Sequence, residues 1–119
     1  MDKFTELNER VVNWADEKGI LKGGTPLAQH GKTEEEVAEV REALFAQDNY
    51  LEYYKNSKGA SVTTIDEIKD GIGDVLVTLL IQCKMQNIDP LDCLELALNV
   101  IEKRKGKMVD GTFVKESTL

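Results

Sequence analysis

Residues 75–83, VLVTLLIQC, constrain the fold of this chain more than any other stretch. They form its longest apolar run, which is too short to span a bilayer, so no membrane partner is expected. Within the helical pattern of residues 64–87, apolar side chains from Val75 onward occupy nearly every side. Such a helix needs other helices around it, and we expect it to be the central helix of an all-α bundle.

Three further helices are predicted from apolar residues at helical spacing. Thr33 with Glu36, and Thr64 with Glu67, form capping-box patterns that mark two helix starts, and Asp89 is the predicted N-cap of the last helix. The four predicted helices cover residues 3–18, 33–55, 64–87 and 90–105.

The segments between these helices differ in character. Residues 19–32 hold four glycines and a proline, which predicts a long surface connection. Residues 50–61, YLEYYKNSKGAS, are expected to lie in an extended helical hairpin. Asp110-Gly111 between two short apolar segments predicts a C-terminal β-hairpin arm.

Length and charge limit the class of protein. A chain of 119 residues with 41% hydrophobic residues fits a single domain over residues 1–119. Its 22 acidic and 15 basic residues give a net charge of -7, which argues against binding to DNA or RNA. Residues 1–10 lack the pattern of a signal peptide, so a cytoplasmic location is expected.

Oligomerisation is expected from burial. The helix over residues 64–87 is apolar on more sides than its predicted neighbours in one small subunit can cover. We therefore expect at least a homodimer.

Cysteine and histidine are assigned no chemistry. Cys83 and Cys93 each have mostly apolar neighbours in a helical pattern, which is typical of buried thiols. His30 is the only histidine, so the chain cannot supply the Glu-x-x-His pairs of carboxylate-bridged di-iron bundles.

Acidic residues gather at the edge of the inward face of the second predicted helix. At 100° per residue, Glu36 and Glu39 border its apolar stripe, whereas Glu35 and Glu42 point further out. Helix capping and the helix dipole explain any one of these glutamates on its own.

A second acidic face lies on the central helix. Glu67, Asp70 and Asp74 are spaced at i, i+3 and i+7, so they project from one side. Gly71 and Gly73 each cost about 1 kcal/mol relative to alanine inside a helix. Close approach of a helix, a metal or a ligand is the usual reason for such glycines.

Two acidic faces opposed in a small bundle would repel each other. Two unit charges about 5 Å apart repel by roughly 3 kcal/mol at an effective dielectric of about 20. Protonation or basic side chains offset such repulsion in some proteins, but carboxylates without histidine are the ligands that Mg²⁺ or Mn²⁺ prefer. We expect a metal site.

Three stretches together resemble a known family. TEEEVAEVREAL, EIKDGIGDVLVTLL and ALNVIEKRKGKMVDGTFVKE are similar to the MazG-like all-α nucleoside triphosphate pyrophosphohydrolases, from WADEKGIL nearly to the C-terminus. The resemblance implies a bundle that forms a homodimer or a homotetramer, whose E-x-x-E and E-x-x-x-D motifs hold Mg²⁺ on a nucleoside triphosphate. Water then cleaves the substrate to a monophosphate and pyrophosphate, a house-cleaning activity on the nucleotide pool.

Carried over by position, the resemblance assigns Glu36 and Glu39 to the first motif, and Asp70 and Asp74 to the second. The family more often has glutamate where this chain has Asp70. The shorter side chain leaves open whether Asp70 or Glu67 completes the metal site.

The hypothesis for the reaction is attack on the α-phosphorus by water activated by two or three Mg²⁺ ions. Glu35 adjoins the ligands and is the candidate general base. Trp14 and Gln29 are candidates for the base of the nucleotide, although a tryptophan on an apolar stripe is more often core. Candidates for phosphate or nucleotide contact, mainly from the resemblance, are Lys32, Asn99, Lys103, Arg104 and Lys107.

An acidic helical adaptor that binds a protein partner through exposed apolar positions is the alternative function. It requires no metal. Stabilisation by Mg²⁺ or Mn²⁺ that is lost when Glu39 and Asp74 are both replaced by alanine would favour the enzyme.

Overall fold

The computed structural model describes residues 1–119 as a mostly helical chain, which confirms the predicted helical class. The chain divides into two compact units, Met1–Asn87 and Ile88–Leu119. The prediction of a single domain stays a prediction. None of the helices combines the length and apolar character that a bilayer span needs.

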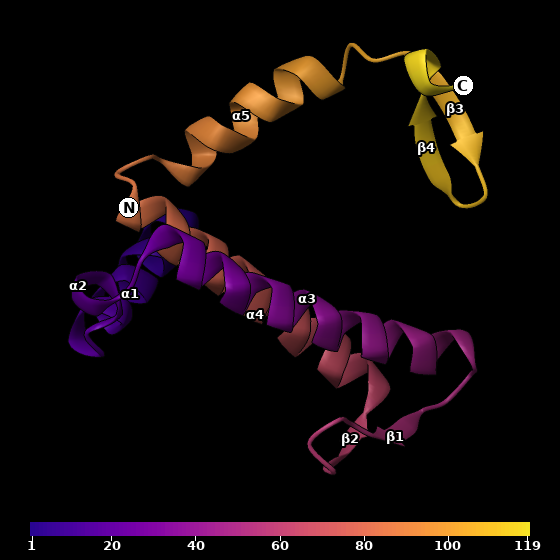
Figure 1. Cartoon of the computed structure of the whole chain (residues 1–119), viewed down its shortest axis with the longest axis horizontal. Coiled ribbons are helices and arrows are strands. Elements are labelled where there is room, and N and C mark those ends of the chain that lie inside the picture. Colours follow the sequence, from indigo (N-terminus) through magenta and orange to yellow (C-terminus); the bar gives the residue numbers. More distant parts are fainter. The chain divides into compact units, whose positions relative to one another are not determined.

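The first unit is a helical bundle with a small β-hairpin. Its helix α4 contacts α1, α2 and α3, so the predicted central helix is central within this unit. In Figure 1, α3 and α4 lie side by side and run in opposite directions, and the hairpin joins them. The elements are α1 (Lys3–Glu17), α2 (Ile20–Gly23), α3 (Pro26–Asp48), β1 (Tyr53–Lys55), β2 (Ser61–Thr63) and α4 (Thr64–Met85).

Small residues let α3 and α4 approach closely. A Cβ added at Gly71 would lie 2.7 Å from Cγ2 of Val40, too close for any side chain. Ala43 is fully buried in the same interface, and the buried Thr33 hydroxyl donates a 2.9 Å hydrogen bond to Oγ1 of Thr78. Close helix packing therefore explains Gly71, one of the two glycines singled out in the sequence.

The predicted start of the second helix at Thr33 is wrong. The helix α3 begins at Pro26, and the side chain of its N-cap Thr25 accepts a hydrogen bond from the backbone N–H of Ala28 at 3.2 Å. A threonine N-cap followed by proline at the first position is a strong start signal. Residues 19–32 are therefore α2 and the first turns of α3, rather than a long loop.

The predicted helical hairpin over residues 50–61 is also wrong. The helix α3 ends at Asp48, Tyr50 has a positive φ of 60°, and the chain then forms antiparallel strands with Tyr53 opposite Thr63. The aromatic and β-branched residues of these strands favour extended backbone over helix. The hairpin also displaces the predicted capping box, because the Thr64 hydroxyl donates to the carbonyl of Leu51 at 2.6 Å.

The second unit contains α5 (Pro90–Ile101), β3 (Gly106–Val109), β4 (Thr112–Lys115) and a short 3₁₀ helix (Glu116–Thr118). The N-cap prediction is confirmed, since Asp89 accepts a hydrogen bond from the N–H of Leu91 at 2.7 Å. The predicted turn is also confirmed: Asp110 and Gly111 have positive φ values of 48° and 88°, as a type I′ hairpin requires.

The end of α5 and the exposure of one cysteine differ from expectation. The helix α5 ends at Ile101, short of the predicted residue 105, and none of its residues is buried. Cys93 on α5 is exposed and Cys83 on α4 is half-buried, so the expectation of two buried thiols is wrong for Cys93.

Candidate metal centre

Three carboxylates from two helices meet at one point of the first unit. Glu36 and Glu39 lie one turn apart on α3, and Asp74 comes from α4. One oxygen from each lies within 4.8 Å of the other two, and all three residues are half-buried. We call these residues the acidic triad.

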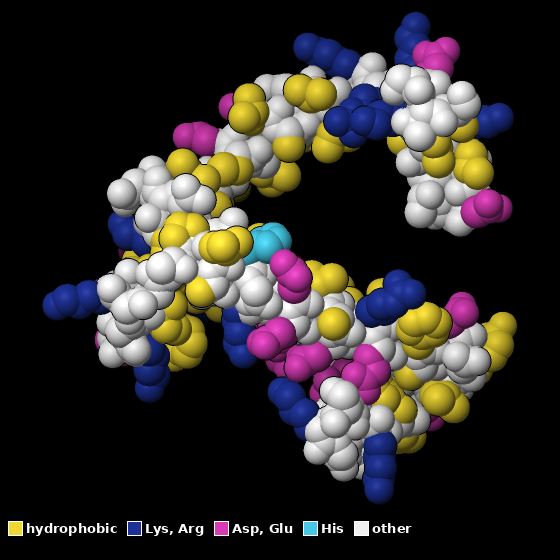
Figure 2. All heavy atoms as spheres, in the orientation of Figure 1, with side chains coloured by type: hydrophobic (Ala, Val, Ile, Leu, Met, Phe, Trp, Pro, Cys, Tyr) yellow, Lys and Arg dark blue, Asp and Glu magenta, His cyan; other side chains and the backbone are white.

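The close packing of α3 against α4 positions the triad. Gly71 and Val40 are in contact, and each lies close in sequence to a triad residue on its helix. The two helices therefore bring their carboxylates to the same interface. Figure 2 shows Asp and Glu side chains gathered where α3, α4 and the β1–β2 hairpin meet.

Burial and repulsion by neighbouring carboxylates make Glu36 costly to ionise. The pKa of Glu36 is raised, first by burial and then by the charges of Glu39 and Asp74, while Lys32 opposes the shift. One carboxylate oxygen of Glu36, Oε2, is buried without a hydrogen-bond partner. Such an atom normally has a partner, so it marks a place where a cation or proton would be stabilised.

Asp74 has a similar environment. Its pKa is raised by burial first, and then by the charges of Asp70 and Glu39. Lys58 lowers it in part. Because the neighbouring carboxylates raise the pKa of both Glu36 and Asp74, negative charge is concentrated at this site, and a divalent cation would offset it.

The triad lines a pocket of about 190 Å³, which we call the acidic pocket. Asp70 and Glu67 both line it, and neither joins the three converging oxygens, so which of them would act as a further ligand stays a prediction. Glu42, expected to point away, lines it too. The reason is that the hairpin folds back and extends the pocket along α3.

The hairpin residues of the pocket were missed by the sequence reasoning. Tyr54, Asn56, Ser57 and Lys58 line the acidic pocket, and Lys58 Nζ lies 3.4 Å from Oε1 of Glu39. The pKa of the Tyr54 hydroxyl is raised by burial and then by nearby glutamates. Two sequence features indicate this hairpin: the paired tyrosines, which are typical of strands, and the turn residues that follow them.

An apolar groove of about 850 Å³ between α1 and α4 adjoins the triad. Asp74 lines both the groove and the acidic pocket, so the two are neighbours. Trp14 lies in the groove half-exposed, as a predicted base contact would require. Phe4, Leu7, Leu76 and Leu80 supply apolar surface beside it.

Three other predicted site residues lie outside both pockets. The Gln29 side chain donates its amide N–H to the backbone carbonyl of Thr78, at 3.4 Å, which ties it to α4. Lys32 pairs with Glu35 at 3.0 Å, and both side chains are largely exposed. Lys32 is still close enough to the triad for Glu36 and Glu39, after Glu35, to raise its pKa.

The remaining candidates belong to the second unit. Asn99 lies on α5 and Lys107 on β3. Lys103 and Arg104 line a small basic hollow of about 370 Å³ together with Lys105 and Lys115. These positions fit contact with an anion, and the role of each residue stays a prediction.

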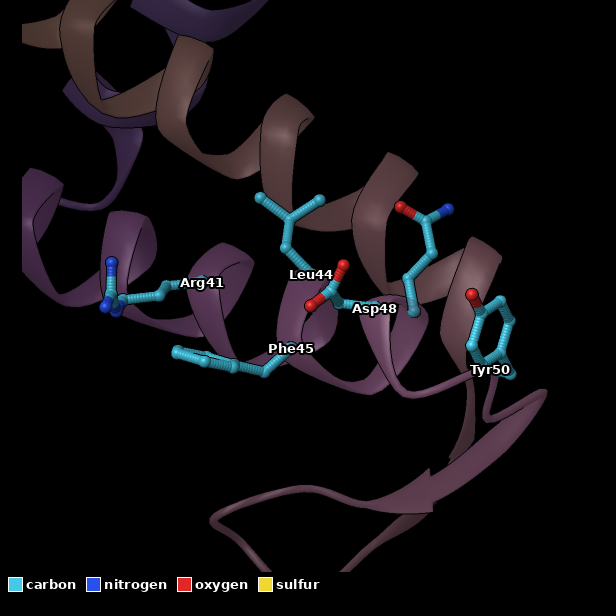
Figure 3. Close-up of a pocket in the computed structure, with 6 residues that line it drawn as sticks. Arg41, Leu44, Phe45, Asp48 and Tyr50 are labelled. Carbon is cyan, nitrogen blue, oxygen red and sulfur yellow. The ribbon is translucent and has the colours of Figure 1, made fainter. Parts of the chain in front are cut away.

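A further hollow, of about 490 Å³, lies on the exposed face of α3 (Figure 3). The Arg41 guanidinium lies 4.9 Å from the ring centroid of Phe45. The other lining residues are Leu44, Gln47, Asp48 and Tyr50. On the helix, Arg41 and Phe45 point away from the triad residues. This hollow brings together no cluster of carboxylates and shares no lining residue with the acidic pocket.

The donor set fits a hard divalent cation. The triad offers oxygen atoms alone, without nitrogen or sulfur, and this is the ligand chemistry that Mg²⁺ and Mn²⁺ share. The unpartnered Glu36 Oε2 supplies an acceptor that the protein itself does not satisfy. Glu36, Glu39 and Asp74 are therefore the residues that would hold the metal.

Comparison of the chain with protein-family models, curated proteins and solved structures gave no match.

Proposed function

We propose that this protein is a Mg²⁺-dependent nucleoside triphosphate pyrophosphohydrolase that forms a nucleoside monophosphate and pyrophosphate. The observation that carries the proposal is the convergence of Glu36, Glu39 and Asp74 within 4.8 Å, with one buried oxygen lacking a partner. The motif resemblance of the same three residues adds the reaction class. Mn²⁺ is a reasonable substitute, because it takes the same oxygen ligands.

The chain's own residues would divide the work. Glu36, Glu39 and Asp74 would hold the metal, with Asp70 or Glu67 as a further ligand at the edge of the pocket. Bound metal would neutralise the triphosphate and supply a water of lowered pKa for attack on the α-phosphorus. Glu35 is the candidate base, although it pairs with Lys32 in this structure.

The neighbouring groove supports a nucleotide rather than a simple polyphosphate as the substrate. It offers Trp14 and apolar surface on the far side of Asp74 from the acidic pocket. A base could stack on the indole while the phosphates lie at the triad. Asp74 would then lie near the junction between the sugar and the α-phosphate.

The direct test is hydrolysis of a panel of nucleoside triphosphates in Mg²⁺, with pyrophosphate and orthophosphate measured separately. In ¹⁸O-labelled water, attack on the α-phosphorus places the label in the nucleoside monophosphate. Label in pyrophosphate, or release of orthophosphate alone, would contradict the proposed reaction.

Paired variants separate the metal site from general stability. Asp74→Asn should lower the catalytic rate by about 100-fold or more, since it removes a ligand charge from the reacting centre. Glu34→Gln is the matched control, because Glu34 is on α3 with its side chain 73% exposed and outside the pocket. A chain without hydrolysis whose melting is unaffected by Mg²⁺ or Mn²⁺ would favour the adaptor.

A further inference from the structure

We propose that Lys58 is a built-in counterion of the acidic triad. When a divalent cation binds, the ion pair between Lys58 and Glu39 breaks, and Lys58 then contacts the phosphates of the substrate. The inference rests on the proposed function, and it assigns a substrate-positioning role to a residue on the β1–β2 hairpin.

The charge of the acidic pocket gives Lys58 its importance. Six carboxylates line the pocket, and Lys58 is the single basic side chain among the lining residues. Its Nζ lies 3.4 Å from Oε1 of Glu39, and its charge lowers the pKa of Asp74. One ammonium group therefore interacts with carboxylates from both helices of the triad.

The hairpin turn holds Lys58 at this position. The Asn56 side-chain oxygen accepts hydrogen bonds from the N–H groups of Lys58 and Ala60, both at 3.0 Å. Gly59 has a positive φ of 81°, and its N–H donates to the carbonyl of Asn56 at 2.9 Å. The N–H of Asn56 also donates to the carbonyl of Ala60 at 2.9 Å, so residues 57–59 form a three-residue loop with glycine in the left-handed region. The backbone of Lys58 is thus fixed, whereas its side chain is 75% exposed and free to change partner.

Electrostatics determines the exchange. An ammonium group and a divalent cation compete for the same Glu39 carboxylate, and the cation has the higher charge and more ligands. Once displaced, Lys58 stays tethered at the mouth of the pocket by its turn. The nearest new anion would be a phosphate group held at the triad, for which a flexible ammonium is a suitable partner.

The test uses the full-length protein and Lys58→Met, which removes the charge and keeps a long side chain. Binding of Mn²⁺ alone is measured first. Loss of a competing surface ion pair should tighten Mn²⁺ binding by about two- to five-fold. Binding of inorganic triphosphate at saturating Mn²⁺ is measured next, and loss of a charged contact should weaken it by about ten-fold.

Opposite signs in the two measurements are the signature of the proposal. Lys55→Met is the matched control, because Lys55 is an exposed lysine of the same hairpin outside the acidic pocket, and both constants should keep their wild-type values. If Lys58→Met weakens both ligands, Lys58 only supports the hairpin, and the proposal is overturned. Unchanged triphosphate binding overturns the phosphate contact.

Failure of the underlying function gives a different result. If the wild-type protein itself binds no Mn²⁺, the metal site is absent, and both the proposed function and the role of Lys58 are rejected. If Mn²⁺ binds with equal affinity to wild type and Lys58→Met, the metal site stands and Lys58 is not its counterion.

Discussion

The protonation of Glu36 and Asp74 links the acidic triad to the stability of the fold. Burial is the first cause of the raised pKa at both residues. The folded state therefore holds these protons more tightly than the unfolded chain, and stability falls as pH rises through the raised pKa values. The stabilising contribution is complete below the ordinary values of 4.5 for Glu36 and 3.8 for Asp74.

Without divalent metal, Glu36→Gln should therefore reduce the loss of thermal stability as pH rises above 4.5, the ordinary pKa of a glutamate, through the raised pKa of Glu36. Glutamine removes the charge and keeps nearly the same shape. Melting curves of wild type and variant across this range measure the effect, and Glu9→Gln, at an exposed position of α1, is the control. A variant with the wild-type pH dependence would show that the triad is not the source.

The two glycines of α4 should respond in opposite ways to alanine. Gly71→Ala meets Val40 at 2.7 Å and should destabilise the fold by about 1–3 kcal/mol, as overpacked cores do. A Cβ at Gly73 meets nothing within 4 Å, so Gly73→Ala should stabilise by up to about 1 kcal/mol. Denaturant unfolding of both variants measures the difference, and equal effects would contradict the described packing.

At the scale of elements, the start of α3 offers a direct check of the fold. Thr25→Ala should destabilise the protein by about 0.5–2 kcal/mol, because the threonine side chain caps the helix at the N–H of Ala28. Thr5→Ala is a suitable comparison, since the N-cap of α1 is Asp2 and Thr5 supplies only its backbone N–H there. Denaturant unfolding measures both, and a neutral Thr25→Ala would argue against the cap.

The helices could be predicted from the sequence because apolar spacing and N-caps are local signals. The failures lie where two local signals competed. Thr33 and Glu36 matched a capping box, yet Thr25 with Pro26 starts the helix. Thr33 instead lies inside α3, where its buried hydroxyl is hydrogen-bonded to Thr78.

The triad could be predicted for the same local reason, since helical spacing fixes which side of each helix its carboxylates occupy. Glu36 and Glu39 therefore meet Asp74 as the pattern indicated, whereas Asp70, which the pattern placed with them, lines the pocket without joining the three oxygens. Lys58 could not be found in this way. Its position depends on a hairpin that was taken for helix, and on how that hairpin folds against α3 and α4.

At the scale of the whole molecule, the single chain leaves an unusual amount of apolar surface exposed. Its buried apolar core consists of Ala15, Ala43, Ala46, Ile68 and Ile81, with no large side chain fully buried. The helix α4 exposes Ile65, Ile72, Leu76 and Leu79 along one face, and the apolar side chains of α5 are exposed as well. Such surface supports the proposal that copies of the chain associate.

Light scattering should accordingly give a dimer or a larger assembly, with a melting temperature that rises with protein concentration. Leu76→Glu places a charge on the exposed face of α4 and should shift the mass toward the monomer. Leu27→Glu is the control, because Leu27 is 83% exposed and lies in the first turn of α3, off that face. A monomeric wild-type protein would contradict the expectation.

The small residues Gly71 and Ala43, which pack between α3 and α4, also determine how far the two sides of the proposed metal site can move relative to each other. Where Gly71 meets Val40, the Val40 side chain packs directly against the backbone of α4, so the two helices cannot move closer together, and buried Ala43 has no rotamers with which to accommodate movement. The backbones that carry Glu39 and Asp74 are thus held close together, and only the two side chains can adjust to an ion. For the proposed metal site, we expect this limited room to favour a small octahedral cation over calcium, with its longer bonds and larger coordination shell.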